Sequence, residues 1–340
     1  MGKNFVSSLS PFWLIFSGAE NVIMPELSPF EILLTLLALS MFFIALAYLI
    51  NANIQYIFHL SFLFLFIHLF LNNLLYPLNF CIGVMFAGLV AYISNKLRFL
   101  TTSGSLATFL LASILFGLGG LKWSVPILSF FILSSIISKL RKRNNQKIDE
   151  YFEKSGVRDH WQVLANGGVG GLLIILYTYT QNELFYLLNI ASLAAVCADT
   201  WATELGTYNN TNTYNIINLK KVTQGRSGGI SVKGTFGAIL GTIVIAVSGL
   251  TWIELPLLNY FVLILSAGVF GSMVDSVIGA TIQVQHKCVS CGKVTEKRMH
   301  CEEETSYFRG VKLINNDIVN FFASISAIIF IIISIIIFSI

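Results

Sequence analysis

The feature that most constrains this chain is a series of long apolar runs separated by short polar breaks. Phe30–Ile50, Phe58–Leu75 and Ile318–Ile340 each approach or exceed the roughly 20 residues that cross a bilayer as a helix. Only 11% of the 340 residues are charged, against roughly 25% in ordinary soluble domains. A water-soluble or disordered chain is therefore excluded, and the sequence predicts an all-α polytopic integral membrane protein.

The apolar runs predict about ten transmembrane helices in two halves. The N-terminal half, 30–138, holds spans at 30–50, 54–75, 78–94, 105–121 and 123–138. The C-terminal half, 161–340, holds spans at 161–180, 184–200, 235–252, 256–283 and 318–339. Residues 1–29 are expected to lie at the membrane interface or to form a short re-entrant piece, because their apolar patch is too short to cross. No small-residue cleavage site follows this patch, so no removable signal peptide is expected.

The basic residues gather in four polar islands, 95–104, 139–160, 218–234 and 284–314. These islands contain every Lys and Arg except Lys3 and Lys122. With ten spans, all four islands fall on one side of the membrane, which the positive-inside rule identifies as cytoplasmic. We therefore expect a multi-pass protein of the cell membrane with a basic cytoplasmic loop at 139–160. Two further cytoplasmic loops are expected at 201–234 and 284–317.

Acidic side chains at membrane depth are the first candidates for a functional site. A buried carboxylate is costly unless it faces a polar cavity. Asp199 and Glu204 stand near the end of the seventh span, and both reach one ion only if the helix ends or bends between them. The alternative is a carboxylate that is hydrated at the interface.

A second acidic position occurs in the ninth span. Asp275, Gly279 and Gln283 share one face of a helix, and the small residues on it permit close approach of another backbone. Two carboxylates at similar depth, Asp199 and Asp275, predict Mg²⁺ ligands. A buried ion pair of Asp275 with Arg226 or Lys233 is the alternative.

The loop at 220–235 mixes glycine, hydroxyl and cationic side chains just before the eighth span. Backbone amides freed by glycine beside a helix N-terminus bind anions, so the loop predicts phosphate binding. It lacks the Gly-Lys-Ser/Thr order of a P-loop, and a loop that merely satisfies topology or touches anionic lipid is the alternative. The candidate residues are Lys220, Gly225, Arg226, Ser227, Gly228, Gly229 and Lys233.

Four soft metal ligands stand in the loop before the last span. Cys288 and Cys291 form a Cys-x2-Cys pair, and His300 and Cys301 follow as neighbours, which requires a sharp turn. This set predicts a closed, structural zinc site. His286 is an alternative ligand, and free thiols are the alternative interpretation.

Amides near helix starts complete the set of candidates. Asn166 enters the sixth span beside two glycines. Asn316, Asp317 and Asn320 open the last span, where an anion is tolerated at a helix N-terminus. Plain N-capping explains this last group equally well.

Together these segments resemble the transmembrane protein 19 family, a membrane family that includes plant phytyl-phosphate kinases. The matching stretches cover about residues 85–335 in the expected order. They are 162–167, 198–206, 227–231, 275–283 and 315–320. The cysteine loop resembles prokaryotic members of the family and is absent from plant and animal members.

The resemblance implies phosphoryl transfer from a nucleoside triphosphate to a polyprenyl monophosphate, such as a phytyl or geranylgeranyl phosphate. Such catalysis depends on positioning and charge neutralisation. The magnesium ligands would be Asp199, Glu204 and Asp275. The cations for the triphosphate would be Lys220, Arg226 and Lys233, beside the 225–229 loop. The acceptor phosphate would be oriented by Asn166, Asn316 and Asp317.

Two other classes of protein are alternatives to a kinase. A membrane transporter or lipid translocator also places polar residues near helix breaks, although a relay through the bilayer needs polar steps across its whole thickness. A structural protein with a zinc loop leaves Asp199 and Asp275 unexplained. The expected partners are the lipid bilayer and the isoprenoid phosphate; no nucleic acid is expected. The oligomeric state stays open, with a homodimer as one option. Prenyl chain length and the choice between ATP and CTP stay open.

Overall fold

The computed structural model describes residues 77–152, 156–253 and 257–338. The predicted interfacial segment 1–29 and the spans 30–50 and 54–75 lie outside the described residues. Within these ranges seven helices are long and apolar enough to cross a membrane. They are α4 (Pro77–Lys96), α5 (Thr102–Asn144), α6 (His160–Thr180), α7 (Glu183–Gly206), α8 (Val232–Leu250), α9 (Leu257–Thr281) and α10 (Asn316–Phe338). The total of about ten spans stays a prediction.

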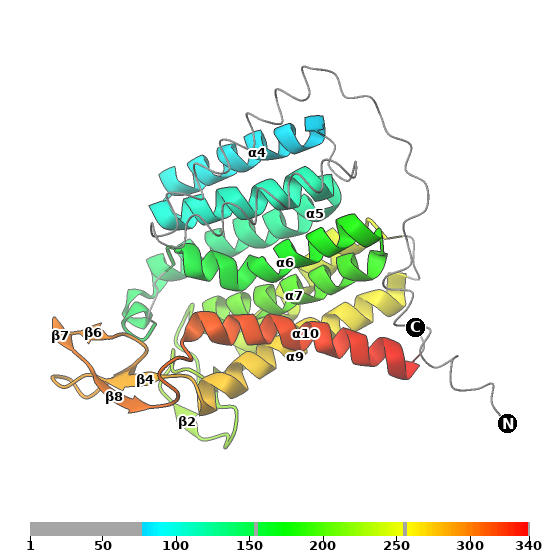
Figure 1. Ribbon diagram of the computed structural model, residues 1–340. Coiled ribbons are helices and arrows are strands. Elements are labelled where there is room, and N and C mark those ends of the chain that lie inside the picture. The colour runs from blue at the N-terminus through cyan, green and yellow to red at the C-terminus, as the bar shows by residue number, and fades with distance from the viewer. Residues whose placement is uncertain (1–76, 153–155, 254–256, 339–340) are drawn as a thin grey trace.

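α5 contains two of the predicted spans, 105–121 and 123–138, on either side of a break at Gly120. This residue has φ 57° and ψ −150°, a conformation that glycine adopts far more readily than residues with a Cβ. Gly104 before the break and Ser135 after it both lie against Arg158. The two halves of α5 therefore return to the same end of the molecule (Figure 1).

α7 is the central helix of the bundle and contacts α5, α6, α8, α9 and α10. Glycines allow the neighbouring helices to approach it closely. A Cβ added at Gly241 of α8 would lie 2.8 Å from the carbonyl oxygen of Cys197, and one added at Gly271 of α9 would lie 2.4 Å from the Cβ of Ala195. This packing on α7 sets α8 and α9 beside the end of α7 that carries Asp199.

The two long loops contain short strands, so the predicted all-α fold is mostly rather than entirely helical. In the first loop, β1 (Thr213–Asn215), β2 (Lys221–Val222) and β3 (Gly229–Ile230) form a sheet in the order β2–β1–β3. In the second loop, β4 (Gln285–Lys287), β5 (Val294–Thr295) and β8 (Ser306–Arg309) form a sheet in the order β5–β4–β8, while β6 (Met299–His300) pairs with β7 (Glu303–Glu304). Pairing satisfies backbone groups of loops that leave the helix bundle. Strands this short carry no run that hydropathy would detect.

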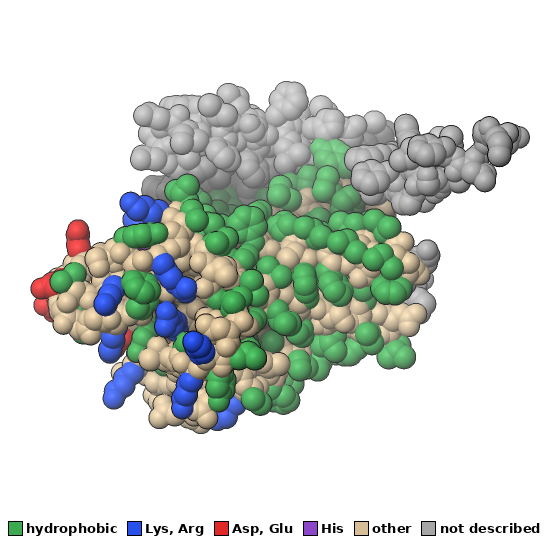
Figure 2. Space-filling view, turned by 90° about the horizontal axis from the view of Figure 1, so that it is seen from below, with side chains coloured by type: hydrophobic (Ala, Val, Ile, Leu, Met, Phe, Trp, Pro, Cys, Tyr) green, Lys and Arg blue, Asp and Glu red, His purple; other side chains and the backbone are tan. Residues whose placement is uncertain are grey.

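The loops and the basic side chains lie at one end of the helix bundle. Figure 2 shows Lys and Arg side chains gathered at that end, while apolar side chains cover much of the remaining described surface. A short 3-10 helix, η1 (Gln146–Glu150), also lies there. Among the described residues, Lys122 is the one Lys or Arg at the opposite end, where it pairs with Glu183. The predicted gathering of basic residues on one side is thus a feature of the fold, and the cytoplasmic assignment of that side stays a prediction.

Candidate functional site

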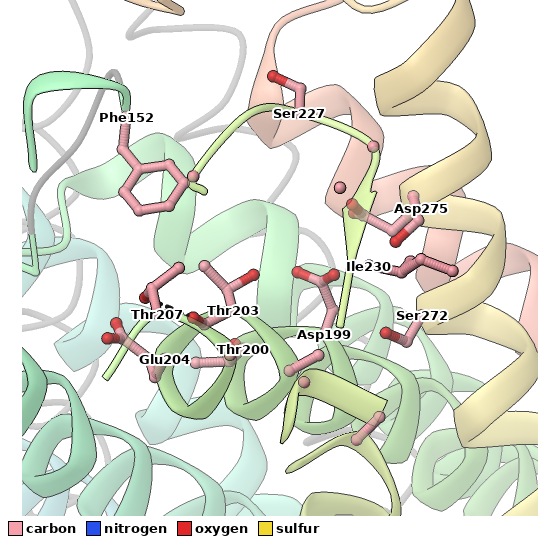
Figure 3. A pocket seen from close by; sticks show the side chains of 18 of the residues that line it. Phe152, Asp199, Thr200, Thr203, Glu204, Thr207, Ser227, Ile230, Ser272 and Asp275 are labelled. Carbon is pink, nitrogen blue, oxygen red and sulfur yellow. Dashed lines mark hydrogen bonds between the residues drawn. The ribbon is translucent and has the colours of Figure 1, made fainter. Parts of the chain in front are cut away.

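A polar cavity of about 320 Å³ lies at the basic end of the bundle. Side chains from α7 and α9 project toward it from two sides, and the loop before α8 passes over it (Figure 3). Three helices begin at its wall: α6 near Gln162, α8 near Ser231 and α10 at Asn316. Helix N-termini carry unpaired backbone N–H groups and a partial positive charge. The cavity therefore favours an anionic ligand.

Asp199 of α7 and Asp275 of α9 face each other in this cavity (Figure 3). Their carboxyl groups are close enough to interact directly. The Oδ2 atom of Asp275 is buried and accepts no hydrogen bond from the described residues. Two carboxylates side by side repel each other unless a proton or a cation lies between them. Their oxygen atoms fit a hard divalent cation such as Mg²⁺.

Glu204 points away from this pair of aspartates (Figure 3). Because α7 continues without a break to Gly206, the condition for Asp199 and Glu204 to share one ion is not met. Glu204 instead accepts hydrogen bonds from Arg141 Nε at 2.7 Å and from Ser138 Oγ at 2.6 Å. The side chain of Arg141 is 2% exposed and also pairs with Asp149. The glutamate thus belongs to a buried ion pair that joins α5, α7 and η1.

The glycine loop, defined as residues 225–229, forms one wall of the cavity. Gly225 and Gly228 have positive φ of 84° and 76°, and a Cβ at Gly228 would lie 2.4 Å from the Cβ of Ala280. Only glycine therefore lets the loop lie this close to α9, one turn beyond Asp275. Lys220 and Lys233 are exposed and lie outside the wall.

Arg226 is the cation that the glycine loop presents to the cavity. Its Nε atom is buried and has no hydrogen-bond partner among the described residues. Arg309 stands close by: burial first, and then the charge of Arg226, lower the pKa of the Arg309 guanidinium. Arg309 lies outside the cavity lining and donates to Gln285 Oε1 and to the carbonyl oxygen of Ala280. Of these two guanidinium groups, Arg226 is therefore the one that can bind phosphate oxygens in the cavity.

The predicted amide side chains also line the cavity. They are Asn166, Gln283, Asn316 and Asn320. The Oδ1 atom of Asn166 is buried without a hydrogen bond to the described residues. Asp317 is buried in the first turn of α10, outside the wall. N-capping of α10 is performed by Asn315, whose Oδ1 accepts from Ile318 N at 3.2 Å.

Arg158 also lines the cavity, although in the sequence it stands out only as one basic residue of the 139–160 island. It is buried, its Nη1 donates to Ser135 Oγ at 2.8 Å, and its guanidinium lies over the rings of Phe130 and Phe131. Burial lowers the pKa of Arg158 to about 10, so the group stays charged near neutral pH. Sequence offers no signal that separates such a buried arginine from the exposed ones around it.

Glu296 was also missed by sequence reasoning. It lies in the wall and accepts hydrogen bonds from Ser227 Oγ at 2.7 Å and from Gln283 Nε2 at 2.9 Å. Its place between the two pairs of cysteine-loop ligands was the available clue. It joins the glycine loop to the end of α9.

A second, apolar cavity lies between α4, the two halves of α5, and α6. Among its wall residues are Val90, Thr108, Leu111, Leu115, Phe130 and Val163. Three residues, Arg158, Gln162 and Asn166, line both this cavity and the polar one. A polar and an apolar compartment therefore meet at one short stretch of chain.

The four predicted zinc ligands converge. Cys288, Cys291, His300 and Cys301 each offer one ligand atom, and these atoms lie within 4.8 Å of one another. Cys301 has φ 54°, which is the sharp turn that adjacent ligands require. Hydrogen bonding from the backbone of Cys291 is the main cause that lowers the pKa of the Cys288 thiol to about 6, and the thiolate is the form that binds metal. His286 does not belong to this group.

Fold and cavity together define the class: a polytopic integral membrane protein with a polar site at one end of its helix bundle. The chain belongs to the integral membrane protein family DUF92, whose family model matches residues 85–328. The resemblance to the transmembrane protein 19 family is thereby confirmed.

Relatives from plants and archaea share most of this region. Protein PGR of Arabidopsis thaliana is 32% identical over 267 residues, which cover 70% of this chain and 90% of that protein. An uncharacterized membrane protein of Methanocaldococcus jannaschii, MJ0933, is 29% identical over 204 residues, covering 59% and 82%. Protein VTE6, chloroplastic, of Arabidopsis thaliana is 22% identical over 226 residues, covering 65% and 61%. No solved structure matches the chain.

Proposed function

We propose that this protein is a prenyl-phosphate kinase, which transfers a phosphoryl group from a nucleoside triphosphate to a polyprenyl monophosphate. The observation that carries the proposal is the meeting of the polar and apolar cavities at Arg158, Gln162 and Asn166. A phosphate head would lie in the polar cavity, and the apolar cavity of about 60 Å³ would take the part of the hydrocarbon tail next to it. The resemblance to a family that includes plant phytyl-phosphate kinases supports the same substrate class.

Asp199 and Asp275 would hold a magnesium ion, which when bound neutralises charge on the donor phosphates. Arg226 and the backbone of the glycine loop would bind the remaining charge of the triphosphate. Arg158 and Asn166 would hold the acceptor phosphate at the junction of the cavities. Glu204 would not belong to this metal site, because both of its carboxylate oxygens accept hydrogen bonds, one from Arg141 and one from Ser138.

The reaction joins two phosphates at this junction. An oxygen of the acceptor monophosphate attacks the γ-phosphorus of the donor, the bond to the β–γ bridging oxygen breaks, and the nucleoside diphosphate leaves. The product is a prenyl diphosphate. The protein contributes alignment and charge neutralisation, which are the main requirements of phosphoryl transfer. We place the basic end of the bundle at the cytoplasmic face of a cell membrane, where nucleotide is present.

The test is transfer of labelled γ-phosphate to geranylgeranyl or phytyl monophosphate by purified protein with magnesium. ATP and CTP are supplied in separate reactions. We expect a labelled prenyl diphosphate from the wild type, and its loss in Asp199→Asn. A folded, magnesium-binding wild type that labels no prenyl phosphate would contradict the proposal and favour a lipid translocator, for which flux of a prenyl phosphate across vesicles is the assay.

A further inference from the structure

One short segment, residues 293–297, links the cysteine cluster to the polar cavity. It lies between the ligand pairs Cys288/Cys291 and His300/Cys301, and it contains Glu296 of the cavity wall. Because both ends of the segment lead within two or three residues to cluster ligands, the cluster constrains where the segment lies.

The same segment contacts both the end of η1 and the glycine loop. Glu296 N donates to the carbonyl oxygen of Tyr151 at 3.0 Å, and Thr295 Oγ1 donates to the carbonyl oxygen of Glu150 at 2.9 Å. The carboxylate of Glu296 in turn accepts a hydrogen bond from the Ser227 hydroxyl of the glycine loop at 2.7 Å. The segment therefore ties the η1 region to the glycine loop.

The regular structure of this loop is limited to short paired strands. Between α9 and α10 the described strands are two to four residues long, and both Cys291 and Cys301 are exposed. Small loops of this kind gain their fold from a bound metal. Three thiolates and one imidazole that converge within 4.8 Å are the donor set of a closed tetrahedral zinc site.

We propose that Cys288, Cys291, His300 and Cys301 bind a zinc ion that fixes segment 293–297, so that Glu296 holds the glycine loop against α9. Glu296 is a positioning residue in this scheme, since it acts through Ser227 and Gln283. The metal site is thus connected to the polar cavity although it takes no part in chemistry. The proposal is independent of which group the cavity transfers.

The first measurement is the zinc content of the purified full-length protein in detergent, determined by elemental analysis. We expect about one zinc per chain in the wild type, as four protein ligands form one tetrahedral site, and loss of that zinc in Cys288→Ser and in Cys301→Ser. Cys81→Ser is the matched control, because Cys81 is buried in α4, away from the cluster. Wild-type protein without zinc would overturn the proposal.

The second measurement is hydrogen exchange of residues 222–231 before and after a chelator removes zinc. We expect exchange there to rise by about tenfold and to return when zinc is added back, while residues 190–198 of α7 stay protected. Glu296→Ala should retain zinc and show the same rise, whereas Glu296→Gln should keep the loop protected, because its amide oxygen still accepts from Ser227. Unchanged exchange after loss of zinc, or in Glu296→Ala, would overturn the proposal.

Discussion

Three acidic residues of the α7 and α9 helices occupy contrasting environments. Glu204 is neutralised by a buried arginine, whereas Asp199 and Asp275 face each other. Only the second arrangement leaves oxygen atoms that a cation can bind. Asp199 and Glu204 are five residues apart along an unbroken helix, so their side chains point to different faces. Glu204 therefore stabilises the fold through Arg141, while Asp199 faces Asp275 in the cavity.

The buried ion pair gives a stability prediction. Arg141→Met leaves the buried Glu204 without its cation, and breaking a buried pair costs about 3 kcal/mol or more of unfolding free energy. Glu204→Gln should cost less, because its amide oxygen still accepts from Ser138. The measurement is unfolding in detergent titrated with denaturant.

Lys142→Met is the control for Arg141→Met, since Lys142 is the next residue along the same helix, is half-exposed, and pairs with Asp149 at 3.8 Å without contacting Glu204. Its unfolding free energy should change by no more than about 0.5 kcal/mol. Equal stability of the two variants would show that the Arg141–Glu204 pair carries no structural energy.

At the scale of elements, hydropathy predicted the helices well, because a helix that crosses the hydrocarbon core needs a run of about 20 apolar residues and such a run is visible in the sequence. The spans at 161–180 and 184–200 correspond to α6 and α7, although α7 continues to Gly206. The short strands of the two loops were not predicted, since strands of this length carry no periodic signal. The cysteine cluster was readable because all its ligands lie in one loop.

The rest of the site depended on distances that one sequence does not encode. Helical periodicity placed Asp199 and Asp275 on faces of their own helices, but nothing in it orders α8, α9 and α10 around α7. Arg158 and Glu296 were missed for the same reason: whether a charged residue is buried depends on partners far along the chain, such as Ser135 and Ser227.

The contact between the glycine loop and α9 supplies a prediction at this scale. Gly228→Ala would combine an unfavourable positive φ with a clash against Ala280, so the loop must move away from the cavity. We expect the rate of phosphoryl transfer to fall by about tenfold or more, while the protein remains folded in detergent.

Gly120→Ala is the control that separates the backbone strain of a positive φ from the clash with α9. Gly120 also has positive φ, yet a Cβ there meets nothing within 4 Å, and the residue lies in the bend of α5, far from the cavity. Its transfer rate should match that of the wild type. If Gly228→Ala were equally active, close contact of the loop with α9 would not be needed.

At the scale of the whole molecule, the helices form two adjoining cavities. α7, α8, α9 and α10 line the polar cavity and α4 lines the apolar one, while α5 and α6 contribute residues to both. The loops at the basic end then bring cations and glycine amides to the junction. The two adjoining cavities fit a substrate that has a charged phosphate at one end and an apolar chain at the other.

Filling the apolar cavity should therefore change the preference for chain length. Thr108→Phe places a ring in the cavity, and we expect the KM for geranylgeranyl monophosphate to rise by about tenfold, which corresponds to roughly 1.4 kcal/mol of lost tail burial. The KM for the shorter geranyl monophosphate should change less. Leu89→Phe, at an exposed position of α4, should leave both values unchanged, and an equal rise for both substrates in Thr108→Phe would contradict a tail site here.

The central claim is that Asp199 and Asp275 serve phosphoryl transfer to a prenyl phosphate, and the most direct measurement is the rate of labelled prenyl diphosphate formation in matched amide variants. Asp199→Asn and Asp275→Asn should each lower kcat by about 100-fold or more, as expected when a ligand of the charge-neutralising metal is lost. Glu183→Gln, at the opposite end of the molecule, should retain the wild-type rate. Labelled product at the wild-type rate from both aspartate variants would contradict the claim.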